Sequence, residues 1–299
     1  MLHDLSLTAA AMCIAGLVLF AIAAWALRRD VVDARGLDKI IALRRGCIAI
    51  PLAVFGALHL FGASFVAGIV PPYMPWRMFW VYGIGCALIA AALSIATNVA
   101  VRWSGLLFGL MMFLFVAQIH LPGAVRLSQE RLWVIVFREL SFGGAGWILA
   151  AQAAGDARSP FARTLTRVGV VLITATALFF GVEHFLHPTG LPGVPLPKQM
   201  PAWLSGRQLI DYITGAGLLA LAATNVLLTR HARTVIASVG AWLLLIVLVM
   251  YGPVLIAALA DPAVGVQVEG INYFADTLLF TGTLLTLASA GVRHPIEGV

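Results

Sequence analysis

The feature of this sequence that most constrains its fold is a series of apolar segments, each about twenty residues long. About twenty helical residues, at 1.5 Å per residue, cross the roughly 30 Å hydrocarbon core of a bilayer. Charged residues make up 11% of the chain, against roughly 25% in a soluble protein. We therefore predict an all-α integral membrane protein with about nine transmembrane helices. The expected segments are 7–27, 47–69, 78–98, 104–121, 132–153, 168–187, 208–229, 234–258 and 271–291.

The basic residues predict how the helices are oriented. If the N-terminus lies outside, thirteen Lys and Arg residues fall in inner loops and five in outer loops. Because inner loops carry the excess of Lys and Arg, we expect a multi-pass protein of the cell (inner) membrane with its C-terminus in the cytoplasm. Arg28 and Arg29 follow the first apolar segment, whereas a signal peptide carries its charge in front, so we expect this segment to be retained. The inner residues are Arg28, Arg29, Arg35, Lys39, Arg44, Arg45, Arg102, Arg158, Arg163, Arg167, Arg230, Arg233 and Arg293; the outer ones are Arg77, Arg126, Arg131, Lys198 and Arg207.

Two stretches of the chain resemble each other and predict a duplication. The stretch from Val54 to Trp76 shares spaced residues with the stretch from Phe179 to Trp203. We expect residues 1–46 to form a first helix and a basic connector with a short helix, and 47–154 and 155–299 to form two four-helix repeats. An even number of helices makes the repeats parallel. The matching pairs are Phe55 and Phe180, Gly56 and Gly181, His59 and His184, Gly68 and Gly193, Trp76 and Trp203, Tyr82 and Tyr212, and Gly85 and Gly215.

Ionisable residues inside the expected helices predict a site near the outer face. Each costs roughly 2.5 to 3.5 kcal/mol at the centre of a membrane helix, and less near the interface. In the expected topology they form one layer, roughly 5–12 Å below the outer surface, which we call the outer polar layer. It holds four carboxylates against one arginine, so carboxyls are protonated, histidines are cationic, or a cation or proton carrier binds. The candidate catalytic residues are Glu183, His184, Asp211, Asp276, Arg138 and Glu139; the candidate ligand-binding residues are His59, Tyr82, His120, His187, Trp203, Tyr212 and Tyr273.

Each of these residues also has a structural interpretation. Arg138 is expected either to form a helix-locking ion pair with Asp276 or Glu183 or to act directly in function. Asp211, near the start of a helix and expected to be fairly exposed, is a candidate for balancing the helix dipole. His59 can also be interpreted as a packing histidine, and Trp76 and Trp203 as aromatic residues of the membrane interface. A metal site is conceivable at Glu183, His184, His187 and His120, although no standard ligand spacing is present.

The outer loops and the cysteines bear on which ligands are expected. Segments 60–76 and 185–207 are apolar and rich in proline, so we expect them to lie in the membrane interface as lids over the outer polar layer. The cysteines, Cys13, Cys47 and Cys86, form no Cys-x-x-Cys pair, which argues against disulfide exchange. The sequence contains no recognisable nucleic-acid-binding module despite its basic pI.

The repeated pattern Phe-Gly-x-x-His, followed by Pro-x-x-Pro-Trp and Phe-Trp-x-Tyr, resembles the DoxX-like family of four-helix membrane proteins. The stretch Ala67–Val101 and the segment GVEHFLHP carry the resemblance, which spans 47–154 and 165–291 as two tandem units after an extra first helix. The resemblance implies an association with membrane redox chemistry, through the DoxD-type subunit of thiosulfate:quinone oxidoreductase and related complexes. It transfers no catalytic residue.

Two functions follow from the sequence. The first is a quinone-linked redox subunit in which histidine, tyrosine and carboxylate side chains bind a quinone, and a partner subunit supplies the electrons. The second is a non-catalytic protein for transport, lipid binding or scaffolding, in which the outer polar layer couples protons or pairs helices. The expected partners are the lipid bilayer, a lipophilic quinone and a redox subunit; the sequence does not decide whether the chain is an enzyme.

Overall fold

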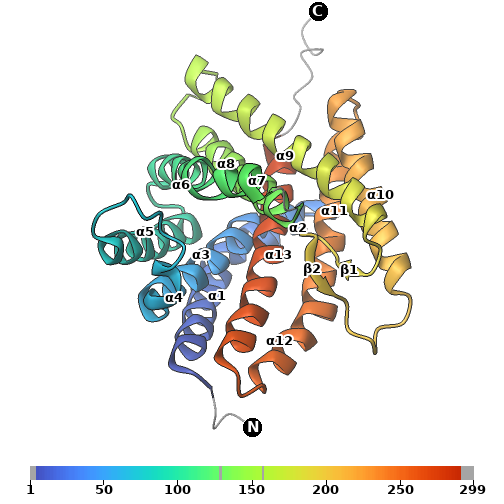
Figure 1. Ribbon diagram of the computed structural model, residues 1–299. Helices are drawn as coiled ribbons and strands as arrows, with labels where there is room; N and C mark the ends of the chain where they lie inside the picture. Colours follow the sequence, from blue (N-terminus) through green and yellow to red (C-terminus); the bar gives the residue numbers. More distant parts are fainter. Residues whose placement is uncertain (1–4, 128–129, 157, 291–299) are drawn as a thin grey trace, which may run out of the picture.

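The computed structural model describes residues 5–127, 130–156 and 158–290. Helices dominate these residues, and one short hairpin interrupts them (Figure 1). The helices of the first half are α1 (Leu7–Asp33), α2 (Leu37–Ala42), α3 (Arg44–Phe61), α4 (Ala63–Ala67), α5 (Arg77–Thr97), α6 (Val101–Phe115), the π-helical η1 (Val116–His120), α7 (Leu121–Leu127) and α8 (Glu130–Gln152). The elements that follow are α9 (Pro160–Leu186), β1 (Gly190–Leu191), β2 (Leu196–Gln199), α10 (Arg207–Val226), α11 (Ala232–Ile246), the π-helical η2 (Val247–Tyr251), α12 (Gly252–Leu259) and α13 (Val264–Ala290).

The predicted fold class, an all-α membrane protein, is confirmed. Among the described residues, eight helical spans are long and apolar enough to cross a membrane. Helix α13 is not among the eight, although it is 27 residues long, because it carries more polar side chains. The count of nine spans therefore remains a prediction. Residues 291 and Arg293, which belong to the expected last helix and the inner-loop tally, lie outside the described residues.

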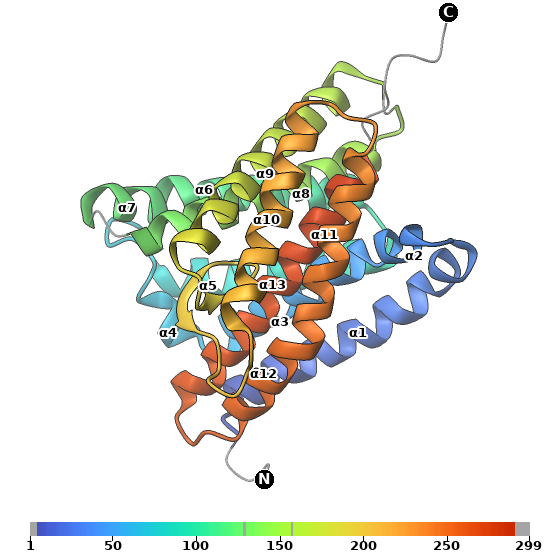
Figure 2. The same cartoon turned by 90° about the vertical axis from the view of Figure 1, so that its right-hand side faces the viewer.

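Helix α13 forms the centre of the bundle. Figures 1 and 2 show it running between α3 and α11, and it also packs against α8, α9 and α12. Nineteen of its 27 residues are buried, including four threonines, and Thr281 and Thr286 each donate a hydrogen bond to the carbonyl four residues earlier. The helix starts at Val264, seven residues before the expected boundary, because Gln267 fixes that end. Its buried side chain accepts from Ser6 N and donates to Asp261 O.

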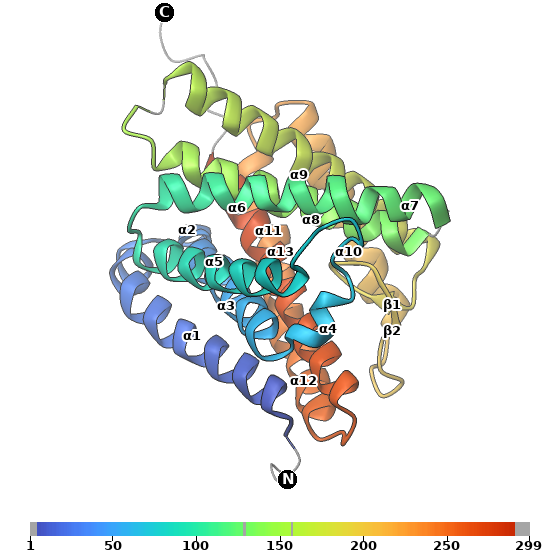
Figure 3. The ribbon, with the colours of Figure 1, turned by 60° about the vertical axis from the view of Figure 1, so that its left-hand side comes forward.

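Several expected boundaries move because charged residues lie at helix ends. Helix α1 continues through the basic residues to Asp33, and the connector contains the short helix that we expected, α2. Two buried residues of α2, Ile41 and Ala42, join it to the bundle. The outer surfaces of α1, α5 and α6 carry exposed apolar residues, as lipid contact requires; Figure 3 shows this side.

The packing order of the helices is similar in the two halves. Helix α3 packs on α5 as α9 packs on α10, and α6 packs on α8 as α11 packs on α13. The two halves exchange their last helices, because α8 packs on α9 and α13 packs on α3. The close approaches also match: a Cβ on Gly85 would lie 3.0 Å from His59 Cβ, and one on Gly215 would lie 2.9 Å from His184 Cβ.

Each π-helical segment ends two positions before a proline. The last residue of η1 is His120, two positions before Pro122, and the last residue of η2 is Tyr251, two positions before Pro253. A proline inside a helix lacks an N–H and crowds the carbonyl four residues earlier. The wider π turn accommodates this change and often marks a functional position. It turns His120 and Tyr251 toward the interior of the protein, where the candidate sites lie.

The expected lid at 185–207 is the largest departure from the predicted arrangement. Its first part forms the β1–β2 hairpin, whose residues Leu191, Val194 and Met200 are buried among the helices rather than in the membrane interface. Its last part keeps the expected exposure, since Trp203 is 61% exposed. The hairpin can be buried because its backbone N–H and C=O groups find hydrogen-bond partners away from water. The two strands pair with each other, and at the tip His184 and Tyr251 bond to the backbone of Gly193 and Pro192. In the 60–76 segment, Trp76 is exposed as expected.

Candidate functional site

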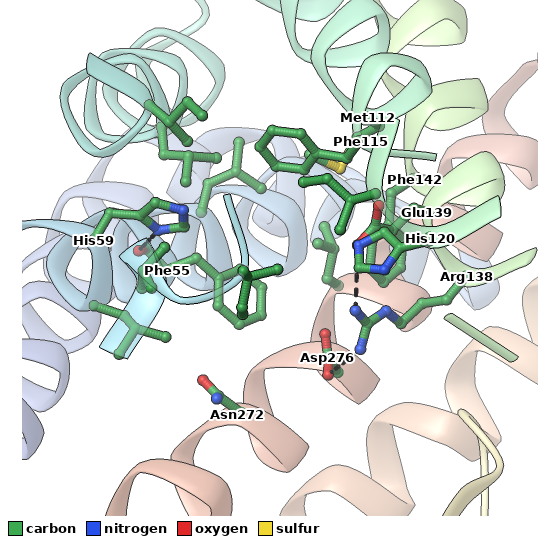
Figure 4. A pocket seen from close by; sticks show the side chains of 18 of the residues that line it. Phe55, His59, Met112, Phe115, His120, Arg138, Glu139, Phe142, Asn272 and Asp276 are labelled. Carbon is green, nitrogen blue, oxygen red and sulfur yellow. Dashed lines mark hydrogen bonds and ion pairs between the residues drawn. The ribbon is translucent and has the colours of Figure 1, made fainter. Parts of the chain in front are cut away.

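A cavity of about 260 Å³ lies between α3, α5, α6, α8 and α13, and we call it the first cavity. Its walls are mostly aromatic and aliphatic, and the side chains of Figure 4 show them surrounding a polar group. The polar residues on the walls are His59, His120, Arg138, Glu139, Asn272 and Asp276. The apolar lining includes Phe55, Phe65, Ile84, Phe108, Met112 and Phe115.

The polar wall of the first cavity is an ion-pair network across three helices. Arg138 Nη1 donates to Asp276 Oδ2 at 2.6 Å, which links α8 to α13. Arg138 Nη2 lies 3.4 Å from Glu139 Oε1, and His120 Nε2 lies 3.0 Å from the same oxygen. Of the two helix-locking pairs expected for Arg138, the structure forms the one with Asp276. The network holds two carboxylates, one guanidinium and one imidazole in a largely apolar surrounding.

Three buried polar atoms on this wall lack hydrogen-bond partners among the described residues. They are Arg138 Nε, a donor, and Glu139 Oε2 and Asn272 Oδ1, both acceptors. A buried polar atom left without a partner costs about 1–3 kcal/mol, and more when the group is charged. All three residues line the first cavity. The wall is therefore equipped to hydrogen-bond a molecule that enters the cavity.

His59 faces this network from the opposite side of the cavity (Figure 4). Its Nδ1 lies 2.8 Å from the carbonyl of Phe55. Because a carbonyl only accepts, Nδ1 carries the proton, and Nε2 of the neutral ring is an acceptor. Among the described residues no hydrogen-bond partner is found for Nε2. The packing interpretation of His59 therefore accounts for one of its nitrogens and leaves the other for a ligand.

His184 has both nitrogens bonded. Nδ1 donates to the Phe180 carbonyl at 2.6 Å, the same contact that His59 makes, and Nε2 accepts from Gly193 N at 2.9 Å. The carbonyl of the same peptide group, at Pro192, accepts from Tyr251 Oη at 2.8 Å. One peptide group of the hairpin is thus held between His184 and Tyr251. His184 is neutral and fully used within the fold, which favours a structural role over the catalytic one predicted.

Asp211 is a buried carboxyl with no hydrogen-bond partner on either oxygen among the described residues. It is 1% exposed, contrary to the expectation that it is exposed. His184 Nε2, 3.9 Å away, is an acceptor and does not neutralise it, and the nearby Gly190 N–H donates to the His187 carbonyl instead. Asp211 is also the fifth residue of α10, beyond the first turn where a helix dipole acts most strongly. The dipole interpretation of Asp211 is therefore not supported.

A second cavity, which we call the hairpin cavity, adjoins Asp211. It encloses about 420 Å³ and is lined by Glu183, His184, His187, Lys198 and Asp211. His187 Nδ1 lies 3.3 Å from Glu183 Oε2. Lys198 Nζ lies 3.3 Å from Glu269 Oε2 and over the ring of Tyr273. Glu183 and His187 therefore belong to this cavity rather than to the first.

The structure divides the outer polar layer into two groups instead of one. His120, Arg138, Glu139 and Asp276 line the first cavity, and Glu183, His184, His187 and Asp211 line the hairpin cavity. The structure thus does not bring His120 to His184 and His187, as a metal site formed by these residues requires. Tyr251 joins η2 to the hairpin beside the second group, because its hydroxyl donates to the carbonyl of Pro192.

Four predicted residues line neither cavity. Tyr82 and Trp203 are exposed to 45% and 61%, Tyr212 stacks on Phe185, and the buried Tyr273 donates its hydroxyl to Glu269. Their positions suit interfacial or packing roles.

Sequence reasoning missed Asn272 and Tyr251. Asn272 lies one helical turn before Asp276 on the same face of α13, and that spacing is a signal that was present in the sequence. Tyr251 had no comparable signal, because the π turn that directs it inward is not visible in a continuous apolar run.

Comparison of the chain with protein-family models, with curated proteins and with solved structures finds no match.

Proposed function

We propose that the first cavity binds the headgroup of a lipophilic quinone and that the chain is a quinone-linked membrane subunit. The observation that carries this proposal is the set of three unpartnered polar atoms, Arg138 Nε, Glu139 Oε2 and Asn272 Oδ1, on the wall of an otherwise apolar cavity. A quinone ring is flat and apolar on its faces and carries oxygens at its edge. It matches a pocket that combines aromatic walls with a few directed polar groups.

Different residues of the first cavity would bind the two ends of such a ring. Arg138 Nε donates to the oxygen at one end of a reduced ring, and Glu139 Oε2 and Asn272 Oδ1 can accept from its hydroxyl. His59 Nε2 accepts from the hydroxyl at the other end. The His120–Glu139 pair, at 3.0 Å, is placed to exchange a proton with the oxygen bound beside it. Phe65 and Ile69, which line the cavity, are 65% and 49% exposed, so an isoprenoid tail can leave toward lipid on that side.

The hairpin supports this assignment from the other half of the bundle. His184 and His59 bond to equivalent carbonyls, and Tyr251 and His120 end the two π segments. In the second half, the peptide group between Pro192 and Gly193 lies between His184 and Tyr251 and bonds to both. We infer that the chain is a tandem duplication and that the corresponding space in the first half is kept for a ligand.

The resemblance to the DoxX-like family and the predicted topology, with the site near the outer face, are parts of the same proposal. Tagging each terminus and testing its accessibility in intact cells and in permeabilised cells would test the topology. A C-terminal tag accessible from outside would contradict it.

The experiment that tests ligand binding uses the purified full chain in lipid nanodiscs. We expect the reduced form, decylubiquinol, to bind, because its hydroxyls can donate to Glu139 Oε2 and Asn272 Oδ1. With the dissociation constant measured by titration calorimetry, binding is expected to weaken at least about tenfold, or 1.4 kcal/mol, in Glu139→Gln and Asn272→Leu. The matched control is Asp211→Asn, which changes a buried carboxyl in the hairpin cavity and leaves decylubiquinol binding unchanged. Loss of binding in all three variants, or no binding by the unmodified chain, would favour the scaffold or transport function instead.

A further inference from the structure

A third cavity of about 500 Å³, far along the bundle from the outer polar layer, lies among the ends of α1, α3, α5, α6 and α8. We call it the basic crevice. Its polar lining is Asp30, Arg44, Arg45, Asn98, Arg102 and Gln152. These residues lie at the ends of helices that the charge distribution places on the inner side of the membrane.

The lining residues of the basic crevice carry a net positive charge. Three guanidinium groups face one carboxylate, that of Asp30, which leaves two positive charges among the lining residues. Asp30 is engaged by Arg45, whose Nη2 lies 2.7 Å from its Oδ2. Among the described residues, no carboxylate lies within ion-pair distance of Arg44 or Arg102.

Two guanidinium nitrogens here are buried without a hydrogen-bond partner among the described residues. They are Arg44 Nε and Arg45 Nη1. The Arg45 side chain is 11% exposed, so its charge is largely withdrawn from solvent. A guanidinium cannot lose its proton in a protein, so its unpaired N–H groups call for an acceptor oxygen.

The backbone adds donors to the same place. Asn98 and Ala100 take left-handed conformations, with φ of 62° and 55°, which turns the chain sharply into α6. Helix α6 has 15 residues, and its N-cap, Ala100, offers no side-chain oxygen to the first N–H groups. Free N–H groups at a helix N-terminus bind anions, and Arg102 lies in that first turn.

Aromatic residues place the basic crevice at the level of lipid headgroups. Trp103 is 59% exposed, and Arg102 Cζ lies 5.5 Å from the centroid of its ring. Exposed tryptophan beside arginine is typical of the membrane interface. From the charge, the unpartnered nitrogens and this position, we propose that the basic crevice binds a phosphate group, carried by an anionic phospholipid or free in solution.

The experiment uses the full chain in phosphatidylcholine nanodiscs, with and without phosphatidylglycerol, and measures thermal unfolding and, by native mass spectrometry, retained lipid. We expect phosphatidylglycerol to be retained and to raise the unfolding temperature. A second arm adds inorganic phosphate to phosphatidylcholine nanodiscs, against sodium chloride at equal ionic strength. Stabilisation by both probes identifies a general phosphate site, and stabilisation by the lipid alone identifies a headgroup site.

The variants assign the effect to the basic crevice. In Arg44→Gln/Arg102→Gln we expect retention of phosphatidylglycerol to fall about tenfold. The control, Arg163→Gln/Arg167→Gln, removes the same charge from two exposed positions near the start of α9 and leaves retention unchanged. Arg102→Gln alone keeps every ion pair found among the described residues and is expected to show a smaller fall, so the test does not depend on the double variant folding. Equal losses in the double variant and the control, or no effect of either probe on the unmodified chain, would overturn the proposal.

Discussion

Arg138 Nη1 on α8 lies 2.6 Å from Asp276 Oδ2 on α13, and this contact joins the last helices of the two halves. Each side chain is largely buried, 16% and 9% exposed. A pair of this kind fixes the relative position of two helices, but its burial also costs desolvation. The contribution of the pair to stability is therefore measured most clearly by removing one partner.

We expect Arg138→Met to destabilise the chain by about 3–5 kcal/mol, because it leaves the Asp276 carboxylate buried without its partner. The double variant Arg138→Met/Asp276→Leu is expected to recover most of this loss. The measurement is unfolding in mixed micelles. The control is Arg233→Gln, whose pair with Asp38 is half exposed and contributes about 1 kcal/mol or less. A double variant no more stable than Arg138→Met would show that the pair has another role.

The two histidines are expected to respond differently to the same substitution. His184→Phe removes the acceptor for Gly193 N and the donor to Phe180 O, so we expect a loss of about 1–3 kcal/mol in stability. His59→Phe removes one backbone contact and leaves the hairpin intact, so we expect a smaller loss of stability together with weaker binding of reduced decylubiquinol. Comparable thermal unfolding of the two variants would contradict this difference.

The hairpin tip depends on one glycine. Gly193 has φ of 98°, and a Cβ there would lie 2.9 Å from Thr277 Cγ2. Gly193→Ala therefore combines backbone strain with a clash, and we expect a loss of about 2–3 kcal/mol. Thr277→Ser removes the clashing methyl group and should recover part of this loss in the double variant. Gly206→Ala, at φ of 74° with open space around it, isolates the backbone term as a control. If both glycine variants unfold at the same temperature, the tip is not packed as described.

The sequence predicted the class of fold and many of the polar residues, because both depend on local composition. Apolar runs of membrane-spanning length stand out directly, and so do Arg138 and Glu139 inside one of them. The ion pair with Asp276 was one of two expected pairs for Arg138, because membrane charges must be paired.

The division of the outer polar layer into two cavities could not be predicted from the sequence. It depends on the hairpin, whose tip enters the bundle because Gly193 N donates to His184 and the Pro192 carbonyl accepts from Tyr251, which lies 59 residues further along the chain. We expect residues at the same depth in the membrane to share one pocket. Depth alone, however, does not show which side of α13 each residue faces. Tyr251 was missed for the same reason, since a π turn sets its direction.

Asp211 offers a last test, of whether its buried carboxyl is structural or is kept for function. Both oxygens lack hydrogen-bond partners among the described residues, so the carboxyl makes no contact there that replaces its lost hydration. Replacing such a group by an apolar side chain of similar size is neutral or stabilising. We therefore expect Asp211→Leu to raise stability by about 1 kcal/mol in micelle unfolding, while Thr214→Val, one turn away, lowers it by removing the hydroxyl that accepts from Trp242 Nε1 at 2.9 Å. A carboxyl retained at a cost to stability is typical of a functional group, so a stabilised Asp211→Leu would direct attention to the hairpin cavity as a second site. A destabilised variant would show that the carboxyl has a stabilising partner inside the bundle and would contradict this expectation.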